Sequence, residues 1–137
     1  MKTHRIDHIG IVVKDAESRL KLYRDLLGLE VDHVEELPER GIRVYFIKIG
    51  ESRFELLEEI DEKSEIHSFL EKRGEGIHHI ALRVDGIEEY IRKAKEVGVK
   101  PLSDEPQRGA HGTRVVFLHP KTTGGILIEL VEGGEGE

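Results

Sequence analysis

The sequence reads IDHIGIVV over residues 6–13 and IHHIALRV over residues 77–84, so one strand-like segment occurs twice in 137 residues. Each segment is followed by an aspartate, Asp15 or Asp85, at a position that suits a helix N-cap. Apolar residues then recur at helical spacing up to a glycine, Gly28 or Gly98, as is typical of a helix end. The chain therefore predicts one strand–helix unit at two places.

Further strand patterns follow both helices. The first half continues with strand-like segments at residues 29–34, 42–49 and 53–58. The second half has a loop at residues 104–112, strand-like segments at 113–118 and 125–132, and a C-terminal EGGEGE that is expected to fray. A short helix is expected between the halves, at residues 64–72.

These segments predict an α+β fold of two tandem βαβββ modules that form a curved mixed sheet around a metal site. We expect a single domain over residues 1–137. Module 1 would cover about 4–60, a linker helix about 61–75, and module 2 about 76–133.

Composition limits the classes of function. The chain has no cysteine, which excludes a thiolate metal site and a cysteine nucleophile. Its formal net charge is −7 and it has no basic patch, so nucleic acid is not an expected partner. No apolar run is long enough to span a bilayer, and the N-terminus lacks the apolar core of a signal peptide. We expect a cytoplasmic protein without a membrane partner.

Strand alternation decides which histidines face away from the helices. One face of each repeated segment is aliphatic and is expected to pack under its helix: Ile9, Ile11 and Val13 in the first, Ile80, Leu82 and Val84 in the second. His8 and His79 lie on the opposite faces, whereas His78 shares the helix-facing parity. The pattern therefore selects one histidine in each half.

The last strand of each half adds a glutamate by the same logic. Glu55 lies between Phe54 and Leu56, and Glu129 lies between Ile128 and Leu130, so both carboxylates point away from an apolar row. A carboxylate within an apolar strand needs a partner. The two histidines and two glutamates, His8, Glu55, His79 and Glu129, predict a site for a borderline divalent metal ion. Salt bridges from the glutamates to Arg43, Arg83 or Arg114 are the alternative.

With these positions placed, the sequence resembles the vicinal oxygen chelate (glyoxalase/bleomycin resistance/dioxygenase) superfamily, and within it the methylmalonyl-CoA epimerases. The matching segments are DHIGIVVKD, ELPERGIRV, FELLE, GEGIHHIALRVD and GAHGTRVVFLHPKTTGGILIELVE. His8, His79 and Glu129 match the metal positions of that family, and Glu55 stands where some relatives have Gln.

The resemblance implies exchange of (2R)- and (2S)-methylmalonyl-CoA by a homodimer. It implies Co²⁺ as the metal, with Mn²⁺, Ni²⁺, Zn²⁺ and Mg²⁺ as alternatives. The metal-stabilised enolate of such a reaction requires groups that remove and return the α-proton. Glu129 is the first candidate base and Glu55 the second, unless both are metal ligands only. Residues 41–46 lack the further acid that some relatives carry there. Glu39, in the loop before Gly41, is an outside candidate, and an ordinary solvated loop charge is the favoured alternative for it.

The glycine-rich loops offer candidate substrate contacts. His111 lies in GAHG, and Lys121 and Thr123 lie in HPKTTGG. Glycines there allow close approach of a ligand to the backbone, so these three residues are predicted to bind the substrate. Ordinary turn chemistry is the alternative for Lys121 and Thr123.

Three other functions remain open from the sequence. The same four ligands would serve a glyoxalase I-type isomerase of a glutathione hemithioacetal. Two histidines and one carboxylate would serve an Fe(II) oxygenase, although Glu55 as a fourth ligand argues against it. A metal-free small-molecule binding module of the same fold is the third possibility.

Overall fold

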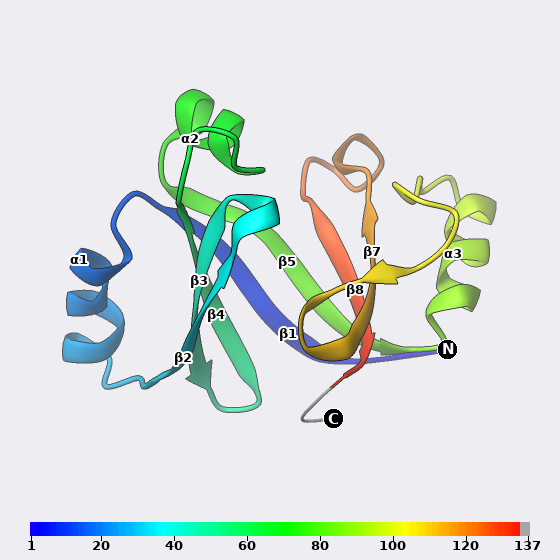
Figure 1. Ribbon diagram of the computed structural model, residues 1–137. Coiled ribbons are helices and arrows are strands. Elements are labelled where there is room, and N and C mark those ends of the chain that lie inside the picture. Colours follow the sequence, from blue (N-terminus) through cyan, green and yellow to red (C-terminus); the bar gives the residue numbers. More distant parts are fainter. Residues whose placement is uncertain (135–137) are drawn as a thin grey trace. The chain divides into compact units, whose positions relative to one another are not determined.

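The computed structural model describes residues 1–134 of the chain (Figure 1). These residues form two compact units. The N-terminal unit is His8–His78, and the C-terminal unit comprises Met1–Asp7 together with the chain from His79 onward. The predicted division into one domain with two modules and a linker stays a prediction.

The N-terminal unit contains a four-stranded sheet in the order β2-β3-β4-β1. Its elements are β1 (Lys2–Val13, of which residues 8–13 belong to this unit), α1 (Ala16–Leu20), the π-helix η1 (Lys21–Leu26), β2 (Val31–Leu37), the 3-10 helix η2 (Pro38–Arg40), β3 (Ile42–Ile49), β4 (Ser52–Glu59) and α2 (His67–Arg73). Strand β4 runs parallel to β1 and antiparallel to β3.

The C-terminal unit has the strand order β1-β5-β8-β7-β6, in which β1 contributes its first residues. Its elements are β5 (Gly76–Asp85, from His79), α3 (Ile87–Glu96), β6 (Gln107–Arg108), the 3-10 helix η3 (Ala110–Gly112), β7 (Thr113–Leu118), the 3-10 helix η4 (Pro120–Thr122) and β8 (Ile128–Gly133). The predicted strand, helix and three further strands are confirmed in the N-terminal unit; in the C-terminal unit the third strand is the two-residue β6, which lies within the stretch predicted as a loop.

Several boundaries differ from the prediction, including the linker helix, which is α2 at His67–Arg73 instead of residues 64–72. The first helix closes as a π-turn, in which the Leu27 N–H bonds the Leu22 carbonyl at 2.9 Å. The Leu29 N–H bonds the Tyr23 carbonyl, so β2 begins at Val31 instead of residue 29. Strand β8 begins at Ile128, after the turn, and includes Gly133 of the predicted tail. Residues 135–137 of that tail lie outside the described part.

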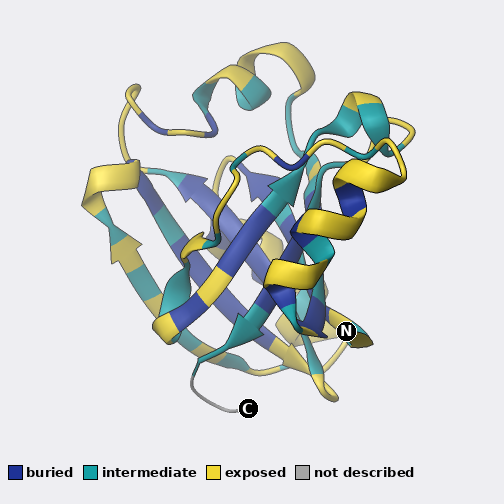
Figure 2. Ribbon diagram, turned by 90° about the vertical axis from the view of Figure 1, so that its right-hand side faces the viewer, coloured by how far each residue is buried: buried dark blue, intermediate teal, exposed yellow. Residues whose placement is uncertain are grey.

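The aliphatic face of each repeated strand packs under its helix, as strand parity predicts. Val13 and Ile11 belong to a core cluster with Leu20 of α1, and Val84 and Leu82 belong to one with residues of α3. Figure 2, with α3 in the foreground, shows buried residues where this helix meets the strands and exposed residues on its outer side. On the opposite face of the N-terminal sheet, Val12, Phe46 and Leu57 belong to a second core cluster, so His8 and Glu55 share that face with buried apolar residues.

Distant glutamates bond the first N–H groups of both helices; the predicted N-cap position of Asp15 is confirmed, whereas the N-cap of α3 is Gly86 and not Asp85. Asp15 stands at the N-cap of α1, but its side chain makes no cap hydrogen bond. Glu58 of β4 instead accepts a hydrogen bond from the Ala16 N–H at 2.7 Å. Arg43 of β3 lies opposite Glu58 and donates to the same carboxylate, with Nη1 2.6 Å from Oε1. Strand pairing therefore positions this cap.

The start of α3 in the C-terminal unit is capped in the same way. Glu132 of β8 accepts from the backbone at the start of α3, including the Ile87 N–H at 3.3 Å. Arg114 of β7 lies opposite Glu132 and donates to it at 3.1 Å. Asp85 instead pairs with His4, whose Nε2 lies 2.7 Å from Oδ2. Both units therefore use a glutamate of the last strand, paired with an arginine of the neighbouring strand, to cap the helix.

Replacing Glu58 with alanine is expected to lower the free energy of unfolding by about 1–2 kcal/mol, because a buried N–H loses its acceptor. Glu58→Gln keeps an oxygen for the Ala16 N–H and should lose less. Urea unfolding of both variants measures the difference, with the exposed Glu62→Gln as the control. An alanine variant with the wild-type midpoint would contradict the cap.

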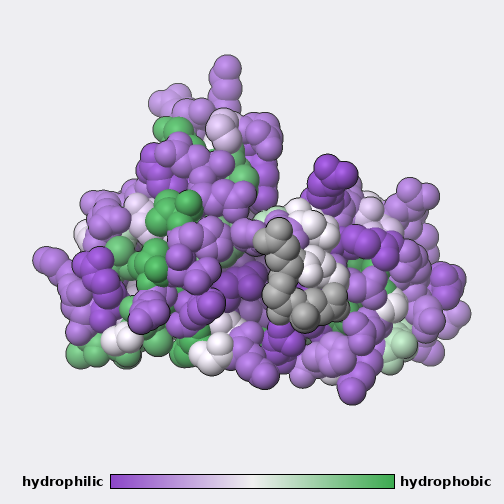
Figure 3. Space-filling view, turned by 60° about the horizontal axis from the view of Figure 1, so that its bottom comes forward, coloured by the Kyte–Doolittle hydropathy of each residue, from purple (hydrophilic) through white to green (hydrophobic). Residues whose placement is uncertain are grey.

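The surface reflects the high charge content of the sequence. The face in Figure 3 is mainly hydrophilic, and hydrophobic residues gather on its left-hand part, on the unit that holds α1. Leu22, Leu26 and Leu27 are exposed large apolar residues of that unit. Among the described residues, no helix has both the length and the apolar character needed to cross a bilayer.

Candidate active site

The N-terminal unit places His8 beside Glu55 on the sheet face opposite α1. His8 Nδ1 lies 3.2 Å from Glu55 Oε2, and the two residues are 6% and 9% exposed. The parallel pairing of β1 with β4 sets Gly10 directly opposite Glu55, and Phe46 of β3 lies on its other side. Because pairing across a sheet keeps side chains on one face, Phe46 and Glu55 share it.

The C-terminal unit builds the same arrangement from different residues. His79 Nε2 lies 3.3 Å from Glu129 Oε1, and both residues are buried. Ala81 of β5 and Phe117 of β7 flank Glu129 in the register. The Phe117 ring meets the His79 ring edge-on, with centroids 5.9 Å apart. A small residue and a phenylalanine therefore flank the glutamate in both units.

Strand parity thus correctly brings one histidine to one glutamate in each unit. A buried carboxylate is costly without a partner, and an imidazole beside it gives a donor set that suits a divalent ion. That all four residues bind one ion stays a prediction.

The arginines named as alternative partners of the glutamates have other acids beside them. Arg43 pairs with Glu58, Arg114 pairs with Glu132, and Arg83 pairs with Asp7. The arginine that contacts a predicted ligand is Arg53, whose Nη2 lies 2.9 Å from Glu55 Oε2. Arg53 was not predicted as a partner, although it lies two residues before Glu55 on β4 and therefore on the same face of that strand.

Neighbouring side chains shift the pKa values of two ionisable residues in the N-terminal unit, Asp32 and His67. A hydrogen bond from His33 lowers the pKa of Asp32, and Lys48 acts in the same direction. A hydrogen bond to Glu59 raises the pKa of His67, at the start of α2. Asp32 and His33 lie on β2, in the same sheet as Glu55.

Comparison with known proteins identifies the family. The sequence profile of the Glyoxalase/Bleomycin resistance protein/Dioxygenase superfamily matches residues 7–117. The chain belongs to this superfamily. Mitochondrial methylmalonyl-CoA epimerase of Mus musculus is 42% identical over 94% of this chain and 73% of its own length. Ethylmalonyl-CoA/methylmalonyl-CoA epimerase of Cereibacter sphaeroides is 43% identical over 92% of this chain and 96% of its own length.

Solved structures agree with the sequence comparison. A methylmalonyl-CoA epimerase in complex with methylmalonyl-CoA and NH4+ superimposes with a TM-score of 0.89, at 40% identity, over 99% of both chains. A variant of the Streptomyces coelicolor enzyme in complex with 2-nitronate-propionyl-CoA gives a TM-score of 0.88, at 40% identity, over 98% of this chain and 97% of that one. The glyoxalase-like fold class is therefore confirmed, and within the superfamily the chain groups with the epimerases.

The three loop residues predicted to bind a substrate, His111, Lys121 and Thr123, lie in short 3-10 helices or the turns that follow them. His111, in η3, adopts a left-handed backbone with φ 57°. Lys121 is exposed, and its backbone N–H donates to His119 Nδ1 at 3.1 Å. The Thr123 hydroxyl donates to the Pro120 carbonyl at 3.2 Å, which is the turn role named as its alternative. Glu39 is exposed in η2.

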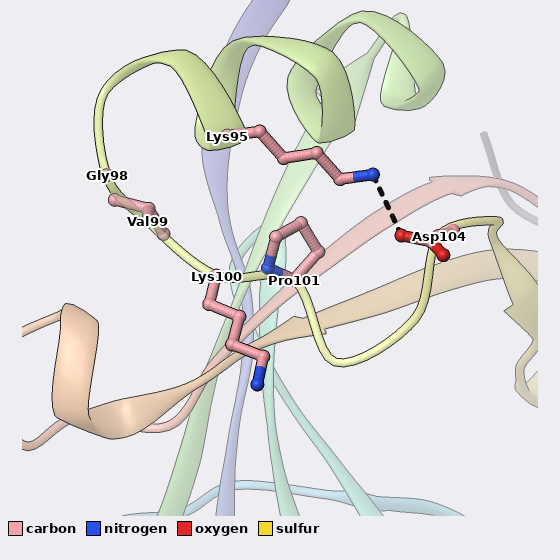
Figure 4. Close-up of a pocket in the computed structure, with 6 residues that line it drawn as sticks. All are labelled: Lys95, Gly98, Val99, Lys100, Pro101 and Asp104. Atoms are coloured by element: carbon pink, nitrogen blue, oxygen red, sulfur yellow. Dashed lines mark hydrogen bonds and ion pairs between the residues drawn. The ribbon is translucent and has the colours of Figure 1, made fainter.

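A surface pocket of about 350 Å³ lies beside the end of α3 (Figure 4). It is lined by Lys95, Gly98, Val99, Lys100, Pro101 and Asp104. In Figure 4, the Lys95 amine reaches across to the Asp104 carboxylate, at 2.8 Å. The lining contains no imidazole, and α3 packs on the sheet face opposite the His79–Glu129 pair. We therefore assign no metal-binding or catalytic role to this pocket.

Proposed function

We propose that the protein exchanges the (2R) and (2S) epimers of methylmalonyl-CoA by proton transfer at the α-carbon. The observation that carries the proposal is the buried histidine–glutamate pair of each unit, in a chain 40% or more identical to methylmalonyl-CoA epimerases over nearly its whole length. These relatives are named as epimerases of methylmalonyl-CoA. The His–Glu pairs supply residue types that can perform it.

His8, Glu55, His79 and Glu129 are proposed to hold one divalent ion, with Co²⁺ as the first candidate. The donor set fits, because neutral imidazoles and carboxylates bind borderline ions and no sulfur is required. Burial of all four residues favours ligation, since a buried carboxylate is stabilised by a cation. When bound, such an ion supplies a Lewis acid that stabilises negative charge developing on the substrate oxygens.

The chain itself must move a proton. The α-hydrogen of methylmalonyl-CoA lies between a thioester and a carboxylate, and its loss leaves an electron pair that delocalises into the thioester carbonyl as an enolate. Glu129 is proposed to take this proton, because its carboxylate is buried beside His79 among the proposed metal ligands, where a substrate held by the ion would lie. Return of a proton to the other face completes the inversion. Glu55 is the second candidate for that step.

Proton exchange at the α-carbon tests the proposal directly. In deuterated water the Co²⁺-loaded protein is expected to convert one epimer into the other and to incorporate deuterium. Protein stripped of metal by a chelator should lose both activities, with recovery on adding Co²⁺ back. Mass spectrometry measures deuterium, and chiral chromatography of the hydrolysed acid measures inversion.

A loaded protein without exchange would reject the epimerase and make a glutathione hemithioacetal the next substrate to test. Exchange that persists unchanged after full metal removal would reject the metal while keeping the reaction. The homodimer, the cytoplasmic location and substrate contacts by His111, Lys121 and Thr123 remain predictions beside this proposal.

A further inference from the structure

Arg53 of β4 reaches along its own strand to Glu55, one of the four proposed metal ligands. Its Nη2 lies 2.9 Å from Glu55 Oε2, the same oxygen that lies 3.2 Å from His8 Nδ1. The Glu55 side chain is 11% exposed and that of Arg53 is 29% exposed, so the contact is largely shielded from water. A hydrogen bond between two charged groups in such a place is strong enough to hold a carboxylate in one orientation.

The Arg53 guanidinium is itself held against the ring of Phe46. Its Cζ lies 5.7 Å from the ring centroid, and Phe46 is 1% exposed within the core cluster of this sheet face. The His33 ring stacks on the same phenyl ring, with centroids 4.2 Å apart and planes inclined by 11°. A bulge of β2 at Asp32 precedes this stack. A planar cation packs well on an aromatic ring, so the buried Phe46 limits where the guanidinium can lie.

The internal repeat contains no counterpart of this arginine. Glu129 corresponds to Glu55, and the residue two positions before Glu129 is Leu127. The repeat does preserve a small residue and a phenylalanine beside each glutamate, namely Gly10 and Phe46 in one unit and Ala81 and Phe117 in the other. The guanidinium is therefore an addition to the N-terminal half and is not required by the scaffold that the two halves share.

We infer that Arg53 is a positioning residue that orients the Glu55 carboxylate for binding of a divalent ion, an inference that rests on the metal site proposed above. A residue that hydrogen-bonds a ligating carboxylate fixes its orientation and so raises the affinity for the ion. The positive charge of Arg53 acts in the opposite direction, because it repels a divalent cation. Solvent screens this repulsion at the partly exposed guanidinium, whereas the hydrogen bond to Glu55 is direct, so orientation outweighs repulsion.

Lys48 of β3 provides a matched control for the charge of Arg53. The two residues lie directly opposite each other in the register of β3 and β4, so both cations share one sheet face. Lys48 pairs with Asp32, with Nζ 3.4 Å from Oδ1. Lys48→Met therefore removes a positive charge beside Arg53 and leaves the contact between Arg53 and Glu55 in place. It should keep the Kd for Co²⁺ within about twofold of wild type, because the exposed amine is screened.

Titration of the metal-free protein with Co²⁺, followed by the visible absorption of the bound ion, tests the inference. Arg53→Met should raise the Kd roughly tenfold to 100-fold, the usual effect of losing such a partner, and should alter the absorption bands. Arg53→Lys keeps a cation and a donor but not the planar fork, so its Kd should lie between those of Arg53→Met and wild type. In a Glu55→Ala background, Arg53→Met should have no further effect, because the carboxylate on which it acts is absent.

An Arg53→Met protein that binds Co²⁺ as tightly as wild type, or more tightly, would overturn the inference. An equal loss of affinity with and without the Glu55 carboxylate would also overturn it, since Arg53 would then act by another route. Thermal midpoints of the metal-free variants check folding, and Arg53→Lys, the milder change, carries the test if Arg53→Met unfolds. A wild-type protein that binds no Co²⁺ would overturn the proposed metal site together with this inference, whereas α-deuterium exchange reports on the epimerase reaction separately.

Discussion

Glu129→Gln is expected to lower kcat for epimerisation by roughly 10²- to 10⁴-fold, the range that general acid–base groups contribute. Glutamine preserves the size of the side chain and an oxygen donor, so the packing beside Phe117 should persist. It cannot accept the α-proton. Steady-state kinetics, metal content and α-deuterium exchange on the same preparation measure the three consequences.

The metal measurement separates two roles of Glu129. Loss of bound Co²⁺ together with activity would assign Glu129 as a ligand, whereas retention of Co²⁺ with loss of exchange would assign it as the base. Glu96→Gln, at the exposed end of α3, is the control and should behave as wild type. Undiminished deuterium incorporation in Glu129→Gln and in Glu55→Gln, both with metal retained, would remove the two glutamates from proton transfer.

Much of the fold follows from local patterns that repeat. The alternation of IDHIGIVV and IHHIALRV has a period of two, and that period alone decides which residues can share a face. It correctly separates His79 from His78, and it separates Glu55 from the apolar row of Phe54 and Leu56. Glycines that adopt positive φ, Gly28 at 70° and Gly98 at 83°, mark both helix ends for the same local reason.

The features that were missed depend on strand register, which no local pattern contains. Glu58 caps α1 because β4 pairs parallel with β1 and so ends near the start of the helix. Arg53 was overlooked because its contact with Glu55 runs along one strand face, while the alternatives were sought on other strands. The bulge at Asp32 requires knowing that Val31 and His33 pair with consecutive residues.

Asp7→Ala is expected to destabilise the protein by about 3–5 kcal/mol, the usual cost of removing one partner of a buried ion pair. Asp7 is 2% and Arg83 5% exposed, and Arg83 Nε lies 3.0 Å from Asp7 Oδ1. The same guanidinium donates to the Gly133 carbonyl at 2.6 Å. Alanine leaves this cation without its carboxylate in a place water reaches poorly. The thermal midpoint should fall by roughly 10–15 °C.

A double replacement tests whether the loss of stability in Asp7→Ala comes from the unpaired charge of Arg83 or from the lost hydrogen bonds. Asp7→Leu combined with Arg83→Met removes both charges and keeps apolar volume, so it should recover much of the stability that Asp7→Ala loses. Asp104→Ala, which breaks the exposed pair with Lys95, should leave the midpoint unchanged. Because Asp7 immediately precedes His8, and Arg83 follows His79 on β5, loss of the pair should also weaken Co²⁺ binding. A double variant as unstable as Asp7→Ala would show that hydrogen-bond geometry, rather than the unpaired charge, dominates here.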